Sequence, residues 1–181
     1  SSKVVYITFD DGPIPECTPL VLDILSKYGI HATFFMVAEN AQRYPELLQR
    51  VREEGHSIGN HTYHHLRGCK TTKQTYMQDI AIAKQVLQTS LFRPPHGRMT
   101  CSQKKALREA GYQIYLWDVL THDYNPKYTP EKMLRIVQRF TRNGSIIVLH
   151  DSLKSKDRML QALPQIIKWL QAEGYTFQTL K

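Results

Sequence analysis

Short apolar runs alternate with longer amphipathic segments along nearly the whole chain, and this alternation restricts the possible folds more than any other feature. The runs are rich in β-branched and aromatic residues, as strands are, whereas the longer segments repeat apolar residues at helical spacing. Glycine follows several helical segments, at Gly29, Gly55, Gly111 and Gly174, where a left-handed residue commonly ends a helix. Strands that alternate with helices form parallel sheets through right-handed crossovers.

The pattern predicts the positions of the elements and limits how the sheet can close. Strands are expected at residues 4–9, 32–37, 56–59, 91–92, 113–118, 145–149 and 175–179, and helices at 18–28, 45–54, 73–88, 102–110, 130–142 and 157–173. An open doubly wound sheet and a barrel both fit this order. Because 181 residues are fewer than the roughly 200 to 250 of a full eightfold barrel, a barrel would be a distorted, shortened (β/α) barrel of about seven parallel strands. No linker or repeat divides the chain, so residues 1–181 are expected to form a single domain.

Composition narrows the class of partner. The formal net charge is +8, which favours anionic partners, but no basic block appears and nucleic-acid binding is not expected. No apolar stretch approaches the ~20 residues of a membrane span, and the start lacks the build of a signal peptide. Three cysteines at unrelated spacings, Cys17, Cys69 and Cys101, argue against a disulfide framework and against a cysteine zinc site.

Residues with acid-base or metal-binding side chains gather just after the predicted strands. In both candidate architectures the active site lies at the carboxyl ends of the strands. The residues found there are Asp10 and Asp11 after the first strand, Asn60, His61 and the run H-T-Y-H-H after the third, Arg93 to Gly97 after the fourth, Asp118, His122 and Asp123 after the fifth, and His150 and Asp151 after the sixth. Five strand ends thus predict one rim of functional side chains.

A metal site is predicted from this rim. If the chain from Thr62 onward turns into a helix, His61 and His65 share one face and can bind one ion, although His64 at three residues' spacing fits equally well. Two histidines and one carboxylate form an open catalytic zinc site. One aspartate of the pair Asp10 and Asp11 would supply the carboxylate.

The other aspartate is free to act as a general base towards a water molecule. Arg93 is the natural partner to keep it ionised, because guanidinium groups stay charged and pair with carboxylates. His150 can donate a proton to a leaving group, and Asp123 can hold that imidazole in place. Simpler interpretations exist: D-D-G-P is typical of a turn, and the side chains of His31, His56 and His96 are expected to be ordinary solvated or hydrogen-bonded histidines.

Five ordered motifs, from Thr8 to Asp151, resemble one known family. They read T-F-D-D-G-P, H-T-Y-H-H, R-P-P-H-G, W-D-V-L-T-H-D-Y and I-V-L-H-D. They are similar to the motifs of the polysaccharide deacetylases of carbohydrate esterase family 4, also called the NodB homology domain. The resemblance implies a distorted barrel and metal-dependent removal of acetyl groups from sugars.

The resemblance also assigns roles by position. Asp10 would be the general base, oriented by Arg93, and His150 the general acid, tuned by Asp123. Asp11, His61 and His65 would bind a divalent metal, most often zinc, with cobalt or nickel as alternatives. The backbone N–H of His96 would polarise the acetyl carbonyl, an oxyanion contact worth ~3 to 4 kcal/mol.

Two departures from the family pattern leave the substrate open. The family's fourth motif usually reads D-S-x-D-W, whereas Leu120 and Tyr124 occupy the first and last of these positions here, and His96 stands where an aromatic residue is common. Contacts to the sugar near Tyr124, His96 and Val148 are therefore less secure. The expected substrates are chitin oligomers or peptidoglycan, handled by an extracytoplasmic monomer. Acetylxylan O-deacetylation and a catalytically silent glycan-binding domain are the alternatives.

Overall fold

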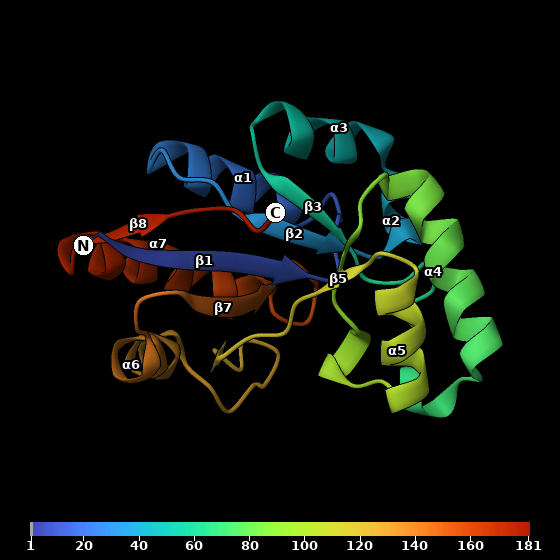
Figure 1. Cartoon of the computed structure of the whole chain (residues 1–181). Coiled ribbons are helices and arrows are strands. Elements are labelled where there is room, and N and C mark those ends of the chain that lie inside the picture. Colours follow the sequence, from blue (N-terminus) through green and yellow to red (C-terminus); the bar gives the residue numbers. More distant parts are fainter. Residues whose placement is uncertain (1) are drawn as a thin grey trace.

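The computed structural model describes residues 2–181, and its strands form a single parallel sheet (Figure 1). The strands are β1 (Lys3–Asp10), β2 (Thr33–Met36), β3 (Ser57–Asn60), β4 (Leu91–Phe92), β5 (Gln113–Ile114), β6 (Val119–Leu120), β7 (Ser145–His150) and β8 (Tyr175–Phe177). Their order is β5-β4-β3-β2-β1-β7-β6, and β8 pairs separately with β1. No ladder joins β5 to β6 within residues 2–181, so the sheet curls without closing. The prediction of a distorted, shortened barrel of parallel strands is confirmed.

Helices connect and cover these strands. They are α1 (Thr18–Lys27), α2 (Ala38–Arg43), α3 (Pro45–Glu53), α4 (Lys73–Leu87), α5 (Cys101–Glu109), α6 (Pro130–Phe140) and α7 (Lys156–Ala172), with short 3-10 turns η1 (Gly68–Lys70) and η2 (Pro95–Gly97). The six predicted helices are present within a few residues of their expected ends. The sequence analysis missed α2, which is only six residues long.

The predicted strand at 113–118 is too long, because β5 covers only Gln113–Ile114 and the next strand, β6, begins beyond the predicted range at Val119. The carbonyl groups of Tyr115 and Leu116 accept hydrogen bonds from the side chain of Arg93 instead of continuing a ladder. The sheet therefore breaks after β5, and the chain crosses to start β6 beside β7.

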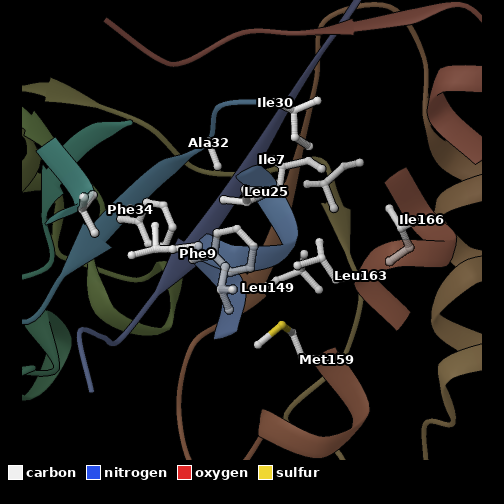
Figure 2. Packing of buried hydrophobic residues seen from close by; sticks show 14 of the residues in the cluster. Ile7, Phe9, Leu25, Ile30, Ala32, Phe34, Leu149, Met159, Leu163 and Ile166 are labelled. Carbon is white, nitrogen blue, oxygen red and sulfur yellow. The ribbon is translucent and has the colours of Figure 1, made fainter. Parts of the chain in front are cut away.

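The two faces of β1 have different partners. Val5, Ile7 and Phe9 belong to the main hydrophobic core, which α1 and α7 cover from outside the curl (Figure 2). Burial of these side chains supplies the main driving force for folding, at about 25 cal/mol per Å² of apolar surface. Thr8 and Asp10 alternate with them and point to the inside of the curl. The first strand therefore delivers its terminal carboxylate to the concave side.

The last residues of the chain close the amino end of the curl. β8 pairs with Lys3–Val5 on the edge of β1 that β2 occupies further along. Leu180 then packs in a small cluster with Phe35 and Leu91, and its N–H donates to Thr33 Oγ1. The opposite, carboxyl end of the strands stays open. No helix among the described residues has the length and apolar character needed to cross a membrane.

Candidate active site

Asp10 and His150 lie side by side at the carboxyl ends of β1 and β7. They are register partners on adjacent parallel strands. Asp10 is buried, with 2% of its surface exposed, and its Oδ1 accepts a hydrogen bond from Arg93 at 2.8 Å. Arg93 follows β4 directly and reaches this carboxylate across the inside of the curl.

The guanidinium of Arg93 is fully buried and held on every side. Beyond Asp10 it donates to Thr8 Oγ1 at 2.7 Å and to the carbonyl groups of Tyr115 and Leu116 at 3.2 and 2.8 Å. Its flat face lies over the ring of Phe35, 4.2 Å from the centroid. A buried arginine satisfied in this way holds one orientation and keeps its charge.

Phe35 can stack on Arg93 because its other neighbour is a glycine. A Cβ atom placed on Gly59 would lie 2.3 Å from Cδ1 of the Phe35 ring, far inside van der Waals contact. Gly59 sits directly opposite Phe35 in the β2–β3 ladder. The absence of a side chain on β3 therefore leaves the space in which the ring supports the arginine.

Asp11 turns away from Asp10. Its φ of 87° lies in the left-handed region, which reverses the chain at the end of β1. The next residue, Gly12, rests on the buried carboxylate of Asp151, whose Oδ1 accepts the Gly12 N–H at 3.2 Å and whose Oδ2 accepts the Thr18 hydroxyl at 2.7 Å. Complete burial raises the pKa of Asp151 to about 7, against the lowering effect of these two hydrogen bonds.

Asp11, His61 and His65 form a cluster of possible metal ligands. Oδ1 of Asp11 lies 3.4 Å from Nε2 of His61 and 3.1 Å from Nε2 of His65. Burial opposes ionisation of Asp11, but the two imidazoles outweigh it and hold the pKa of this carboxyl well below its usual value. Bond lengths of about 2.0–2.1 Å would place tetrahedral ligand atoms about 3.3–3.4 Å apart, so the donor set fits a zinc-sized ion.

The chain from Thr62 onward does not form the helix that the spacing argument for His61, His64 and His65 assumed. Residues 61–67 form a loop in which Thr62 and His65 have φ values of 65° and 56°. The carboxylate of Asp79 accepts the N–H groups of Tyr63 and His64 and also contacts Nδ1 of His64 at 2.6 Å. His64 therefore points to Asp79, which leaves His65 beside His61.

The second nitrogen of His61 is also occupied. Its Nδ1 lies 2.7 Å from the carbonyl oxygen of Arg93, which can only accept, so Nδ1 carries a proton and Nε2 is the nitrogen that faces Asp11. Metal-binding histidines commonly have such a partner on the far nitrogen. Arg93, directly after β4, thus orients the His61 imidazole through its carbonyl group and the Asp10 carboxylate through its guanidinium group.

His150 is held by Asp123. Nδ1 lies 2.7 Å from Asp123 Oδ1, and the His150 N–H donates to the other carboxylate oxygen at 2.6 Å. Burial lowers the pKa of His150, but the hydrogen bond to Asp123 and the negative charges of Asp123, Asp10 and Asp11 outweigh it and raise the pKa to about 9. The imidazole is therefore protonated at neutral pH.

A cleft of about 730 Å³ opens over these residues. Its walls include His96, Trp117, Leu120 and Tyr124, with the Tyr124 ring edge-on to His150 at 5.6 Å between centroids. The His96 backbone has a φ of 59°, and its N–H donates no hydrogen bond within residues 2–181. Val148 differs from the expectation of a substrate contact, because it is fully buried and its β6 register partner Leu120 lines the wall instead.

Sequence reasoning misplaced Asp118 as well as Val148, and it missed other residues. Asp118 lies at the amino end of β7, where it accepts the Ile146 N–H, so it is remote from the rim. Arg67, Arg98 and Lys154 line the cleft but were not singled out. Arg67 follows the second motif by two residues and Arg98 follows the third directly, which is the signal that could have identified them.

Comparison with known proteins agrees with this geometry. A family model described as polysaccharide deacetylase matches residues 1–115. The chain belongs to the polysaccharide deacetylase family. This match covers the first three motifs and ends before Asp123 and His150. The match assigns no role to any single residue, so the roles of all the site residues stay predictions.

Relatives of this family resemble the chain over nearly its whole length. A peptidoglycan-N-acetylglucosamine deacetylase of Bacillus cereus is 38% identical, covering 99% of this chain and 87% of the relative. A chitooligosaccharide deacetylase of Bradyrhizobium is 29% identical, covering 99% and 90%. The crystal structure of a peptidoglycan N-acetylglucosamine deacetylase bound to a naphthyl N-hydroxybenzamide superimposes with a TM-score of 0.94 at 33% identity, covering 98% of this chain and 86% of that one.

Proposed function

We propose that this chain is a divalent-metal-dependent hydrolase that removes the acetyl group from N-acetylglucosamine units of peptidoglycan or of chitin oligomers. The observation that carries the proposal is the separation of two adjacent aspartates. Asp10 faces Arg93, whereas Asp11 faces His61 and His65. Because the proposed base and one proposed metal ligand are consecutive residues, general-base catalysis and metal binding would take place next to each other.

Asp11, His61 and His65 would hold the metal ion. Two imidazole nitrogens and one carboxylate oxygen suit zinc best, and cobalt or nickel accept the same donors. Three protein ligands leave a coordination position open. When bound, the ion supplies Lewis acidity towards the acetyl carbonyl and lowers the pKa of water at that position.

Asp10 would act as the general base. Arg93 occupies its Oδ1, and Oδ2 accepts no hydrogen bond from any residue in 2–181, so this oxygen is available to the attacking water. Arg93 places a permanent positive charge beside the Asp10 carboxylate, 2.8 Å from its Oδ1. It also fixes the carboxylate in one rotamer, which aligns Oδ2 with the water before reaction.

His150 would complete the reaction as the general acid. Asp123 occupies Nδ1, so Nε2 of the protonated ring can donate its proton to the departing amine. The free N–H of His96 would contact the carbonyl oxygen as negative charge develops on it. Leu120 and Tyr124 would wall the acetyl methyl group, with Leu120 taking the wall position expected of Val148.

The named relatives support an amide substrate on an N-acetylated glycan. A net charge of +8 favours an anionic polymer such as peptidoglycan over neutral chitin oligomers. That polymer lies outside the cytoplasm, so an extracytoplasmic location follows from the same proposal. All the site residues come from one chain, so a monomer suffices.

Acetate release is the direct test. The purified protein with zinc is expected to release acetate from peptidoglycan or N-acetylglucosamine oligomers, and more slowly or not at all from acetylxylan. Asp10→Asn should retain the metal and lose turnover by 10²-fold or more, because the base contributes typically 10²–10⁴. Asp11→Asn should lose the metal itself. Asp23→Asn, a surface control on α1, should change neither property.

Two results would reject the proposal. One is a folded protein that releases no acetate from any of these glycans with zinc or cobalt added, which would favour a silent glycan-binding domain. The other is equal metal retention by Asp10→Asn and Asp11→Asn, which would contradict the separate roles of the two aspartates.

A further inference from the structure

A series of unpaired cations leads away from the cleft on the side of His96. A second hollow of about 290 Å³ adjoins the cleft and shares Arg67, His96 and Arg98 with it, and Lys70 is a further member of its wall. A third hollow of about 340 Å³ shares Arg98 with the second and adds Lys104 and Arg108. The walls of the second and third hollows contain no aspartate or glutamate.

Arg67 and Arg98 lack the carboxylate partners that several other arginines have within residues 2–181. Arg50, Arg93 and Arg142 each form an ion pair. Neither Arg67 nor Arg98 forms an ion pair within residues 2–181, and neither guanidinium donates a hydrogen bond to the protein there. Each guanidinium has five N–H donors in a planar fork that matches a carboxylate.

The backbone beneath these two side chains is fixed, although the side chains are exposed. The Arg67 carbonyl accepts the Lys70 N–H and the Thr71 hydroxyl. The Arg98 N–H donates to the Pro95 carbonyl.

Gly68 and Gln103 join the two segments. A Cβ atom on Gly68 would lie 3.1 Å from the Arg98 carbonyl oxygen, so the segments are packed together. The buried side chain of Gln103 ties them further, because its Nε2 donates to the Gly68 carbonyl while its Oε1 accepts the Thr100 N–H. The two guanidinium groups thus extend from one rigid platform beside the cleft.

We propose that Arg67 and Arg98 form a subsite for a carboxylate carried by the glycan near the N-acetyl group that is removed. The inference rests on the proposed function and narrows its substrate class to carboxylated polysaccharides. Peptidoglycan carries such groups on lactyl ethers and attached peptides, whereas chitin oligomers carry none. Arg67 and Arg98 are specificity residues in this proposal and take no part in the proton transfers.

The test compares two forms of one substrate. Soluble peptidoglycan fragments are used as such and after conversion of their carboxylates to methyl amides, which removes charge and leaves the N-acetyl groups. The double substitution R67Q and R98Q is expected to lower kcat/KM for the carboxylated fragments about tenfold through KM, and to change it less than twofold for the amidated fragments. Added salt should weaken the wild-type preference and have little effect on the variant.

R135Q is the matched control, because it removes one positive charge from an exposed arginine on α6 outside the cleft lining. It should behave as wild type on both fragments. Equal losses on both fragments, no loss on either, or the same loss in R135Q would overturn the subsite.

Calorimetric binding of the same two fragments separates this proposal from the proposed function. If the wild-type protein releases no acetate, the function fails, and a binding preference for carboxylated over amidated fragments that disappears with R67Q and R98Q still supports the subsite. Absence of that preference in wild type rejects the subsite whatever the activity.

Discussion

Replacing Asp151 by asparagine should change how stability depends on pH. The Asp151 carboxyl is completely buried beneath Gly12, and its pKa is about 7 in the folded protein. In the unfolded chain an aspartate has a pKa of about 3.9. The difference of about 3 units at 1.36 kcal/mol each corresponds to about 4 kcal/mol.

The sign of this effect follows from proton binding. Between pH 4 and pH 7 the folded protein holds a proton on Asp151 that the unfolded chain has released, so the free energy of unfolding falls as the pH rises through this window. Asparagine binds no proton there and keeps a similar shape. Relative to wild type, Asp151→Asn should therefore gain up to about 4 kcal/mol between pH 4 and pH 8.

Urea denaturation of the metal-free proteins at several pH values measures this difference directly. Thr18→Val is the companion variant, because it removes the hydroxyl that donates to Asp151 and lowers its pKa. That variant should move the pH-dependent window upward. A difference between Asp151→Asn and wild type that stays constant within about 1 kcal/mol from pH 4 to pH 8 would show that the carboxyl ionises normally, and would refute the reasoning.

Three further predictions concern the inside of the curl and the rim. Gly59→Ala should destabilise the protein by about 1–3 kcal/mol in urea denaturation and reduce acetate release, because the new methyl group displaces Phe35 against Arg93. The double variant with Phe35→Leu should recover part of the lost stability. A double variant no more stable than Gly59→Ala would contradict the clash. Removing the metal with a chelator should lower the thermal midpoint of unfolding, and excess zinc should restore it by mass action in the wild-type protein but not in His65→Ala. His64→Ala should behave as wild type, because His64 contacts Asp79. The reverse pattern would show that His64, and not His65, is the metal ligand. The rate of amide deacetylation should fall as the pH rises through about 9, where His150 loses its proton. Asp123→Asn should move this fall to lower pH, because it removes a negative charge that raises the pKa of His150. An unchanged pH profile in Asp123→Asn would exclude the Asp123–His150 pair as the acid.

The sequence predicted the long buried strands better than the short strands beside the break in the sheet. Alternating apolar runs identified β1, β2 and β7, because a buried parallel strand needs such a run whatever surrounds it. The run at 113–118 looked like one strand, yet Arg93 takes the carbonyl groups of Tyr115 and Leu116. Arg93 lies about twenty residues before these carbonyl groups, so nothing in the sequence at 113–118 indicates that the strand ends early.

The candidate site was predicted as a set of residues rather than as a geometry. His61 and His65 come together as expected by family resemblance, but on a loop held by Asp79 of α4 rather than on a helix. His96 was expected to have an ordinary side chain, and that expectation stays a prediction. Its backbone N–H is free to donate a hydrogen bond within residues 2–181. Trp117, Arg67 and Arg98 also line the cleft. Trp117 begins the fourth motif and the two arginines follow the second and third motifs, but tertiary packing decides that their side chains face the cleft.

The position of β1 between β7 and the β2–β8 edge has a consequence for folding. β1, which ends at Asp10, is made before the other strands, whereas two of its three partners come from residues 145–177, so their contacts span most of the chain. Such long-range pairing slows folding. During synthesis Asp10 is therefore made about 140 residues before its register partner His150, so the rim can assemble only after β7 has left the ribosome.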